Sequence, residues 1–364
     1  MIVFPVRNCY NGFLAGGIHM APTMKDLSQI TGLGLATISK YFNGGTVREK
    51  NRILIENAVK QLHFVPNEVA RSLKTRRSHV IGVVIPELSN AFITSIISAM
   101  EDLLRRRNYA VIVCDCRSDP KREKEAVNFL LNRQVDGLIN MPTDATGTHL
   151  KSAMAAGIPV VLVDRLIPAL DGQVSAVVID NVRASEKAIQ ELLNAGHRHI
   201  GLILGEPDLY TTNCRLQGYL NSLRAVGITP SQEDIRYANY TMNGGYQAVQ
   251  QLMQQPDPPT ALFITNFEMT IGGMLALQNM GIRVPEDLSV IGFDKLEMFG
   301  NIFPHLTLIH QPQHSIGQEC ANLILALLNE ENRLSHRTVI LNTQLTRGTS
   351  VHPPKQAEAG KEFA

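Results

Sequence analysis

The 364-residue sequence predicts a small all-α head followed by an α/β core of two Rossmann-like lobes. Three observations predict this division. Short amphipathic helical segments fill residues 23–66, a polar and basic connector follows at 67–78, and from residue 79 apolar runs of strand length alternate with helical segments. A chain of this length is expected to hold two or three domains and to bury a substantial core.

The first helix of the head is expected at residues 24–31. Thr23 and Asp26 have the spacing of a capping box, and the helical repeat places Met24, Leu27 and either Ile30 or Thr31 on the inward face. Gly32 is expected to end this helix.

Two further helices complete the predicted head. The second runs from about residue 35 to 42 and is closed by the turn NGG at 43–45, and the third spans residues 48–63. The third is amphipathic, with these apolar residues at helical spacing: Ile53, Leu54, Ala58 and Leu62.

Residues 32–34, GLG, raise the possibility of a nucleotide-binding turn. A dinucleotide fingerprint needs G-x-G-x-x-G after a strand, but here Thr37 holds the third glycine position and a polar helix precedes. Two short helices joined by a tight glycine turn and braced by a third are instead typical of a helix-turn-helix. In that motif the second helix enters the major groove of DNA.

The second helix has one face for the core and one for DNA. Ile38, Tyr41 and Phe42 are expected to point inward, and Lys40 can donate hydrogen bonds to guanine in the groove. The expected DNA-contacting residues of the head are Leu35, Ala36, Thr37, Ser39, Lys40 and Asn43. The alternative is an unrelated three-helix bundle.

Positive charge is concentrated at this end of the chain. Residues 23–78 contain ten Lys or Arg and four Asp or Glu, a net charge of +6, so the other residues carry −5 in a chain of net charge +1. A basic module joined to an acidic body indicates a polyanionic partner for the module alone, although a solvated charged face has the same pattern.

Apolar runs alternate with amphipathic helices after residue 79. The runs VIGVVIP, YAVIVCD, VDGLINM and IPVVLVD are separated by helical segments such as AFITSIISAMEDLLRRR, which predicts parallel sheet in βαβ units. The pattern resets near Ser175, where SAVVID, HIGLILG, TALFITN and LSVIGFD supply a second set of strands. Two similar α/β lobes facing each other across a cleft are expected.

The segments TMKDLSQITGLGLATISKYFN and VPNEVARSLKTRRSHVIGVVIP resemble the lactose-repressor/galactose-repressor (LacI/GalR) family of bacterial transcription regulators. The resemblance extends to about residue 350 and implies a periplasmic-binding-protein-like core at 79–351. Lobe 1 is expected at about 79–179 plus 310–338 and lobe 2 at about 180–309 plus 339–351, with a tail at 352–364.

The resemblance also implies a role for the connector. In this family the matching segment folds into a hinge helix on DNA, and the leucine matching Leu73 wedges into the minor groove. The hinge residues expected at DNA are Asn67, Ala70, Arg71, Leu73 and Lys74. One such helix is too short to stand alone, so two are expected to pair in a homodimer on a palindromic operator. The tail shows no leucine heptads for a tetramer.

The family's effector pocket can be matched residue by residue. Asn90, Asp164, Asn266 and Asp294 follow the carboxyl ends of apolar strands, where open α/β sheets bind ligands. The full expected set is Asn90, Phe92, Asp164, Arg165, Arg215, Asn266, Asp294 and Gln311. The alternative for strand-end Asp and Asn is simple helix capping. Phe267 stands where the family has aspartate, which leaves the orientation of Asn266 open.

These side chains favour a monosaccharide or a sugar acid as the effector. Carboxylates and amides suit hydroxyl groups, and an aromatic face covers a sugar ring. Purine recognition would use more stacking, and Phe92 is the clear aromatic candidate. The expected function is a repressor of a sugar-utilisation operon. The alternatives are a purine- or corepressor-responsive regulator and a sugar-binding protein without DNA activity.

Other function classes are disfavoured by the sequence. The motifs G-x-S-x-G and H-E-x-x-H are absent, so no catalytic residue, metal or cofactor is expected. The alternative is an enzyme that uses Asp164 or Asp294 as an acid or base. No stretch approaches the roughly 20 apolar residues that span a bilayer. Five cysteines without C-x-x-C spacing suit the reducing cytoplasm. Residues 1–22 lack a signal-peptide core and are expected to be disordered or foreign to the native protein.

Overall fold

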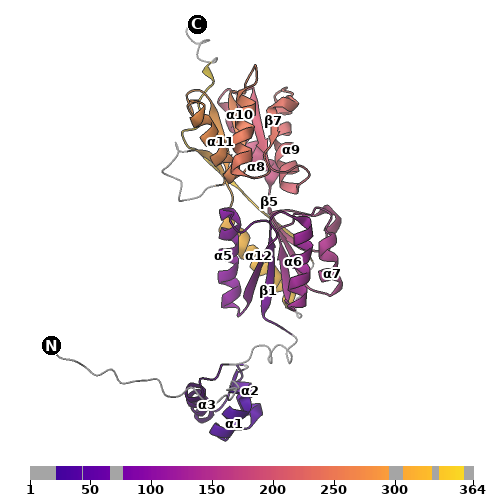
Figure 1. Ribbon diagram of the computed structural model, residues 1–364, viewed down its shortest axis with the longest axis vertical. Helices are drawn as coiled ribbons and strands as arrows, with labels where there is room; N and C mark the ends of the chain where they lie inside the picture. Colours follow the sequence, from indigo (N-terminus) through magenta and orange to yellow (C-terminus); the bar gives the residue numbers. More distant parts are fainter. Residues whose placement is uncertain (1–21, 43, 66–76, 295–305, 330–335, 356–364) are drawn as a thin grey trace, which may run out of the picture. The chain divides into compact units, whose positions relative to one another are not determined.

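The computed structural model describes residues 22–42, 44–65, 77–294, 306–329 and 336–355. The chain divides into two compact units, Met1–Arg76 and Arg77–Ala364 (Figure 1). Each unit has its own hydrophobic core. None of the helices in the described ranges is long and apolar enough to cross a membrane.

The described part of the first unit folds into three helices, α1 (Met24–Thr31), α2 (Leu35–Phe42) and α3 (Glu49–Leu62). The capping box predicted at the start of α1 is present. The backbone N–H and the hydroxyl of Thr23 donate to the Asp26 carboxylate at 2.7 and 2.8 Å, which holds the pKa of Asp26 below its ordinary value. Gly32 ends the helix with a left-handed φ of 67°, a conformation that glycine adopts without strain.

The core of the first unit confirms the inward face of α2 and corrects that of α3. Its buried members are Leu27, Ile38, Ile55, Ala58 and Phe64. Ile53 and Leu54, expected to point inward, are 48% and 38% exposed. Successive helical residues are about 100° apart, so only one of three consecutive apolar residues faces the core, and here it is Ile55.

The described part of the second unit contains two six-stranded sheets, one in each lobe. The sheet of lobe 1 is parallel throughout, in the order β11-β5-β4-β3-β1-β2. Its strands are β1 (Val80–Ile85), β2 (Ala110–Asp115), β3 (Gly137–Asn140), β4 (Val160–Val163), β5 (Ser175–Ile179) and β11 (Thr338–Leu341). The central strands are apolar runs because helices cover both faces of the sheet.

Helices from distant parts of the chain cover lobe 1. Its helices are α5 (Ala91–Arg106), α6 (Pro120–Asn132), α7 (Lys151–Ala155) and α12 (Gln313–Leu328), with short turns η1 (Thr148–Leu150) and η2 (Pro168–Leu170). α5 packs with α12 on one face, and α6 packs with α7 on the other. Figure 1 shows the late-sequence helix α12 lying among the early-sequence elements of this lobe.

Lobe 2 repeats the arrangement with one antiparallel edge. Its sheet has the order β12-β10-β9-β8-β6-β7, and β12 runs antiparallel to β10. Its strands are β6 (Ile200–Leu204), β7 (Ile235–Tyr237), β8 (Ala261–Ile264), β9 (Ser289–Phe293), β10 (Thr307–His310) and β12 (Gln344–Thr346). Its helices are α8 (Asn181–Asn194), α9 (Tyr210–Ala225), α10 (Met242–Met253) and α11 (Phe267–Asn279), with the short turn η3 (Gln232–Asp234).

The structure places one segment outside the lobe expected for it. Residues 339–341, expected in lobe 2, lie in β11 and pair with β5 in lobe 1, so the last crossing follows Leu341. The strand SAVVID is β5 and belongs to lobe 1, which agrees with the expected bounds of 79–179 but not with its grouping among the second set of strands. An apolar strand pairs with partners far away in sequence, so its own residues do not specify which sheet it joins.

Candidate functional site

Helix α2 exposes the residues expected to contact DNA. Leu35 is 45% exposed, Ala36 and Lys40 are also exposed, and Thr37 and Ser39 are half-buried. Ile38 is fully buried on the opposite side of the helix. The other expected DNA contacts lie outside the described residues: Asn43, Asn67, Ala70, Arg71, Leu73 and Lys74.

A hydrogen bond and apolar packing join α2 to α3. The Tyr41 hydroxyl donates to Glu56 Oε1 at 3.4 Å, and Arg52 forms ion pairs with Glu56 and Glu49 on the same helix. Partial burial and the nearby Glu56 carboxylate raise the pKa of Tyr41. The Tyr41 hydrogen bond and the burial of Ile38 leave the opposite face of α2 exposed, as a recognition helix requires.

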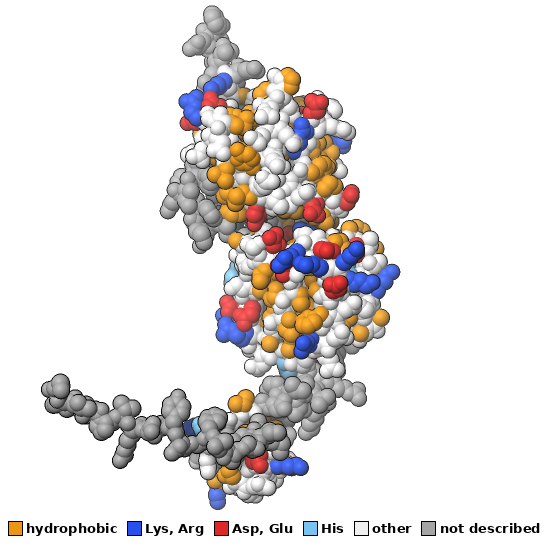
Figure 2. Space-filling view, in the orientation of Figure 1, with side chains coloured by type: hydrophobic (Ala, Val, Ile, Leu, Met, Phe, Trp, Pro, Cys, Tyr) orange, Lys and Arg blue, Asp and Glu red, His pale blue; other side chains and the backbone are white. Residues whose placement is uncertain are grey.

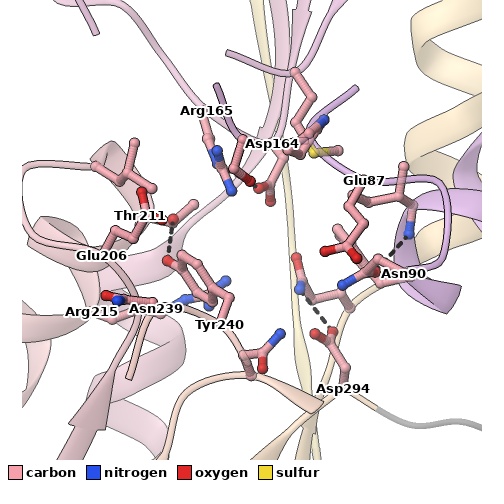
Figure 3. Close-up of a pocket in the computed structure, with 18 residues that line it drawn as sticks. Glu87, Asn90, Asp164, Arg165, Glu206, Thr211, Arg215, Asn239, Tyr240 and Asp294 are labelled. Carbon is pink, nitrogen blue, oxygen red and sulfur yellow. Dashed lines mark hydrogen bonds and ion pairs between the residues drawn. The ribbon is translucent and has the colours of Figure 1, made fainter. Parts of the chain in front are cut away.

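A cleft opens between the two lobes of the second unit. It holds about 700 Å³ of space free of protein atoms, counting the part open to solvent. All eight residues expected to bind the effector line it: Asn90, Phe92, Asp164, Arg165, Arg215, Asn266, Asp294 and Gln311. Figure 3 shows Glu87 and Asn90 from lobe 1 across the opening from Thr211 and Tyr240 of lobe 2.

The topology explains why these residues meet. Asp164 follows β4, Asn266 follows β8, Asp294 follows β9 and Gln311 follows β10. Parallel strands end at one edge of their sheet, and this carboxyl edge is where open α/β sheets bind ligands. Both lobes turn that edge toward the cleft, so short loops from two sheets surround it.

Asp164 and Asp294 occupy equivalent positions in the two lobes. Each has a left-handed backbone, with φ of 66° and 67°, and each is less than 10% exposed. Non-glycine residues in this region are uncommon and concentrate at functional sites. Burial raises the pKa of Asp294 to about 7, although Arg215 opposes the shift. Asp294 can therefore be either a donor or an acceptor near neutral pH.

Arg215 is anchored beneath the cleft by α8, β8 and β9. Its Nε donates to Asn181 Oδ1 at 2.9 Å, its Nη1 donates to the carbonyl of Thr265, and its guanidinium lies 4.0 Å from the ring centre of Phe293. The side chain is almost fully buried. These contacts hold the guanidinium in one orientation, which suits a fixed donor to a ligand.

Asn90 and Asn266 cap helices and also line the cleft. Asn90 Oδ1 accepts from the Ile93 amide at 3.2 Å, and Asn266 Oδ1 accepts from the Met269 amide at 2.9 Å. Both asparagines are therefore helix caps, as the alternative interpretation predicted, and both also lie at the wall of the cleft. The side-chain amides of both donate to the carboxylate of Glu268, so the orientation of Asn266 is determined despite Phe267.

Tyr240 is a second aromatic wall that the sequence analysis missed. Its hydroxyl is 2.9 Å from the hydroxyls of Thr211 and Thr212, and the Arg165 guanidinium lies 5.7 Å from its ring centre. The ring packs directly on Gly205, where a β-carbon would lie 1.9 Å from ring atom Cζ. Gly205 is therefore required for the position of the ring.

Further lining residues were not predicted from the sequence: Glu87, Ser118, Met141, Glu206, Leu209, Thr211, Asn239 and Tyr240. Glu87, Ser118, Met141 and Glu206 follow the ends of β1, β2, β3 and β6 within three residues. Applying the strand-end rule to every strand would have found these four. Tyr240 follows the three-residue strand β7, which is too short to stand out in the sequence. The described residues contain no group of three or more side chains that could hold a metal ion.

Comparison with known proteins agrees with this architecture. Residues 78–347 match the family described as periplasmic binding proteins and sugar binding domain of LacI family. The HTH-type transcriptional repressor CytR of Escherichia coli (strain K12) is 32% identical, over 84% of this chain and 89% of that protein.

Solved structures support the same assignment. The complex of the transcriptional regulator CelR with cellobiose matches with a TM-score of 0.68 and 28% identity, over 90% of this chain and 99% of that one. The lac repressor dimer bound to operator and the anti-inducer ONPF matches with a TM-score of 0.82 and 25% identity, over 92% of this chain and 100% of that one. A basic three-helix head, two α/β lobes around a polar cleft and a matching sequence over most of the chain place this protein in the LacI family of transcription regulators.

Proposed function

We propose that this protein is a cytoplasmic transcription repressor that binds a palindromic operator as a homodimer and responds to a sugar bound in the cleft. The exposed face of α2, with Lys40 at its end, supplies the DNA-reading surface. The cleft supplies the control, because a ligand that contacts both lobes binds one lobe arrangement more tightly than another. The observation that carries the proposal is the convergence of eight polar and aromatic side chains from both lobes on one cleft.

The charges of the cleft favour a neutral sugar over a sugar acid. Four acidic side chains line it, from Glu87, Asp164, Glu206 and Asp294, against two guanidiniums, and the first three outnumber the guanidiniums even when Asp294 is protonated. On the face seen in Figure 2, acidic and basic side chains gather at the junction of the lobes. A ligand with its own negative charge would meet a net repulsion, whereas hydroxyl groups can donate to carboxylates without one.

Both arginines of the cleft donate to acceptors within the protein, although the buried Nε of Arg165 has no hydrogen-bond partner among the described residues. Arg165 donates from Nη1 to the Pro142 carbonyl at 2.9 Å and lies 3.6 Å from the Asp164 carboxylate. Gln311 lacks a donor. Its Nε2 donates to Asp294 at 2.7 Å, but its buried Oε1 has no hydrogen-bond partner among the described residues. An unsatisfied buried acceptor stabilises a ligand that brings a donor. Sugar hydroxyl groups meet that need.

A purine or a nucleoside is the second candidate effector. Phe92 and Tyr240 give the cleft two aromatic residues, where the sequence analysis had identified only Phe92. A nucleoside combines a sugar, for which the polar groups are suited, with a flat base that can stack on an aromatic ring.

A thermal-shift screen tests the effector. D-ribose, D-glucose and cellobiose represent neutral sugars, gluconate and galacturonate represent sugar acids, and adenine, adenosine and cytidine represent the second candidate. A ligand at 100 times its Kd stabilises the folded protein by about 2.7 kcal/mol. We expect a neutral sugar to give the largest shift. A larger shift with a sugar acid contradicts the charge argument, and a shift confined to adenine or the nucleosides supports the second candidate.

The DNA proposal is tested with a duplex selected from a random pool by the wild-type protein. Leu73→Ala is expected to weaken binding to this duplex while the thermal transitions of the protein stay unchanged, because a side chain that wedges between base steps supports a bend in the DNA. Affinity is measured at several salt concentrations, since phosphate contacts alone set the salt dependence. Equal affinity of the two proteins at every salt concentration argues against the hinge wedge.

A further inference from the structure

One half-buried carboxylate joins the two lobes next to the cleft. Glu268 belongs to α11 of lobe 2, and its Oε1 accepts from Asn90 Nδ2 of lobe 1 at 2.8 Å. Its Oε2 accepts from Asn266 Nδ2 of lobe 2 at 2.7 Å. The two oxygens of a single side chain therefore hold one residue from each lobe.

The hydrogen bonds continue from Glu268 into the first turns of two helices. Asn90 caps α5 by accepting from the Ile93 amide, and Asn266 caps α11 by accepting from the Met269 amide. The resulting chain of four hydrogen bonds runs from the start of α5 in lobe 1 to the start of α11 in lobe 2. Both helix N-termini carry partial positive charge, which favours a carboxylate between them.

Glu268 is separate from the predicted effector contacts. It is absent from the residues that line the cleft, whereas Asn90 and Asn266 both line it. Glu268 thus acts on the cleft through the two asparagines. Partial burial and the nearby Glu87 carboxylate raise the pKa of Glu268, and the two asparagine amides oppose this shift by stabilising the ionised side chain.

We propose that Glu268 is an interlobe clasp, a positioning residue that holds the lobes in the arrangement seen here and fixes Asn90 and Asn266 at the wall of the cleft. Arg165 and Tyr240 form another contact between the lobes. The half-buried guanidinium lies 5.7 Å from the ring centre, so this contact is longer and less directional than the hydrogen bond from Asn90 to Glu268. Only the consequence for effector affinity rests on the proposed function. The clasp itself is a property of the ligand-free protein.

Two reciprocal substitutions test the clasp in the full-length protein. Glu268→Gln keeps the side-chain size but gives up one of the two acceptors, so an amide donor of an asparagine faces another donor. Asn90→Ser keeps a good N-cap residue on α5, but serine is too short to reach Glu268. Hydrogen–deuterium exchange of the first turns of α5 and α11 is measured by mass spectrometry without ligand.

The clasp predicts effects that cross from one lobe to the other. Glu268→Gln, a change in lobe 2, is expected to speed exchange at the start of α5 in lobe 1 by roughly tenfold, as for loss of one hydrogen bond to a charged group. Asn90→Ser, a change in lobe 1, is expected to do the same at the start of α11. The double variant is expected to match the faster single variant, because both changes break the same link. Glu125→Gln on the exposed surface of α6 is the matched control and leaves both turns unchanged.

Faster exchange confined to the lobe that carries each substitution, or additive effects in the double variant, overturns the clasp. If one variant loses its thermal transition and so fails to fold, faster exchange in the opposite lobe of the other variant still tests the clasp. The affinity of the best ligand from the thermal-shift screen is then compared between wild type and Glu268→Gln. Equal ligand affinity in the wild type and Glu268→Gln shows that the clasp has no role in ligand binding, and it leaves the proposed function intact. If no screened ligand shifts the thermal transition, the proposed function is contradicted, but the exchange result still tests the clasp.

Discussion

Gly205→Ala should displace Tyr240 and remove one wall of the cleft. Gly205 follows β6, and its backbone does not lie in the left-handed region, so alanine causes no backbone strain. The strain arises from the ring, because an added β-carbon lies 1.9, 2.1 and 2.4 Å from three ring atoms of Tyr240. Real atoms do not approach so closely, and the Tyr240 side chain must leave its site.

The size of the effect follows from the contacts that Tyr240 then loses. Its hydroxyl gives up its bonds to Thr211 and Thr212, each with a net value of about 1 kcal/mol. Its ring gives up the Arg165 guanidinium, at about 0.5–1 kcal/mol. We therefore expect a loss of about 2–3 kcal/mol in the free energy of unfolding, which lowers the melting temperature by roughly 4–12 °C for a unit of this size.

A double-mutant cycle with Tyr240→Ala isolates this cause. Unfolding is followed by circular dichroism for the wild type, both single variants and the double variant. With the ring absent, Gly205→Ala should change stability by no more than about 0.5 kcal/mol, as is usual for a site without a specific conflict. An equal cost in the two backgrounds refutes the steric argument. Effector affinity should fall in Gly205→Ala and in Tyr240→Ala alike.

Three further substitutions address the head and the buried charges. Lys40→Ala should weaken binding to the selected duplex by about 1–3 kcal/mol in fluorescence anisotropy without changing the thermal transition, and undiminished binding argues against a base contact. The pKa of Asp294 is raised to about 7, so the folded protein binds more protons than the unfolded chain between about pH 4 and pH 7, and stability falls as pH rises through that window. Asp294→Asn should flatten this fall in urea titrations from pH 5 to pH 8, and an unchanged slope contradicts the shift. Arg215→Met should cost about 3–5 kcal/mol, because Asn181 Oδ1 and the Thr265 carbonyl lose their buried donor, and a cost below about 1 kcal/mol shows that they find other partners.

Much of the fold is predictable from the sequence because its signals are local. The capping box at Thr23 and the glycine at position 32 bound the first helix as expected. Ile38 is buried and Lys40 exposed, as the 3.6-residue repeat predicts. The apolar runs predicted as strands are strands, and the strand-end residues such as Asp164 and Asp294 lie at the cleft.

The errors share one physical origin. The run at 53–55 contains three apolar residues, and only packing against α1 and α2 selects Ile55 for the core. The sheet that β5 and β11 join depends on backbone partners far away in sequence. Both outcomes depend on long-range contacts, which a local pattern does not contain.

By itself, the sequence determined that a basic helical head precedes two parallel α/β lobes and which strand ends carry polar side chains, since capping, periodicity and strand-end position act between neighbours in the chain. Only the tertiary structure decided that Tyr240 rests on Gly205 and that Glu268 joins Asn90 to Asn266. Glu268 is separated from Asn90 by 178 positions in the chain but its Oε1 lies 2.8 Å from the Asn90 amide nitrogen. Such a pairing exists only after both lobes have folded and met, because hydrogen bonding and packing depend on distance in space rather than on distance along the chain.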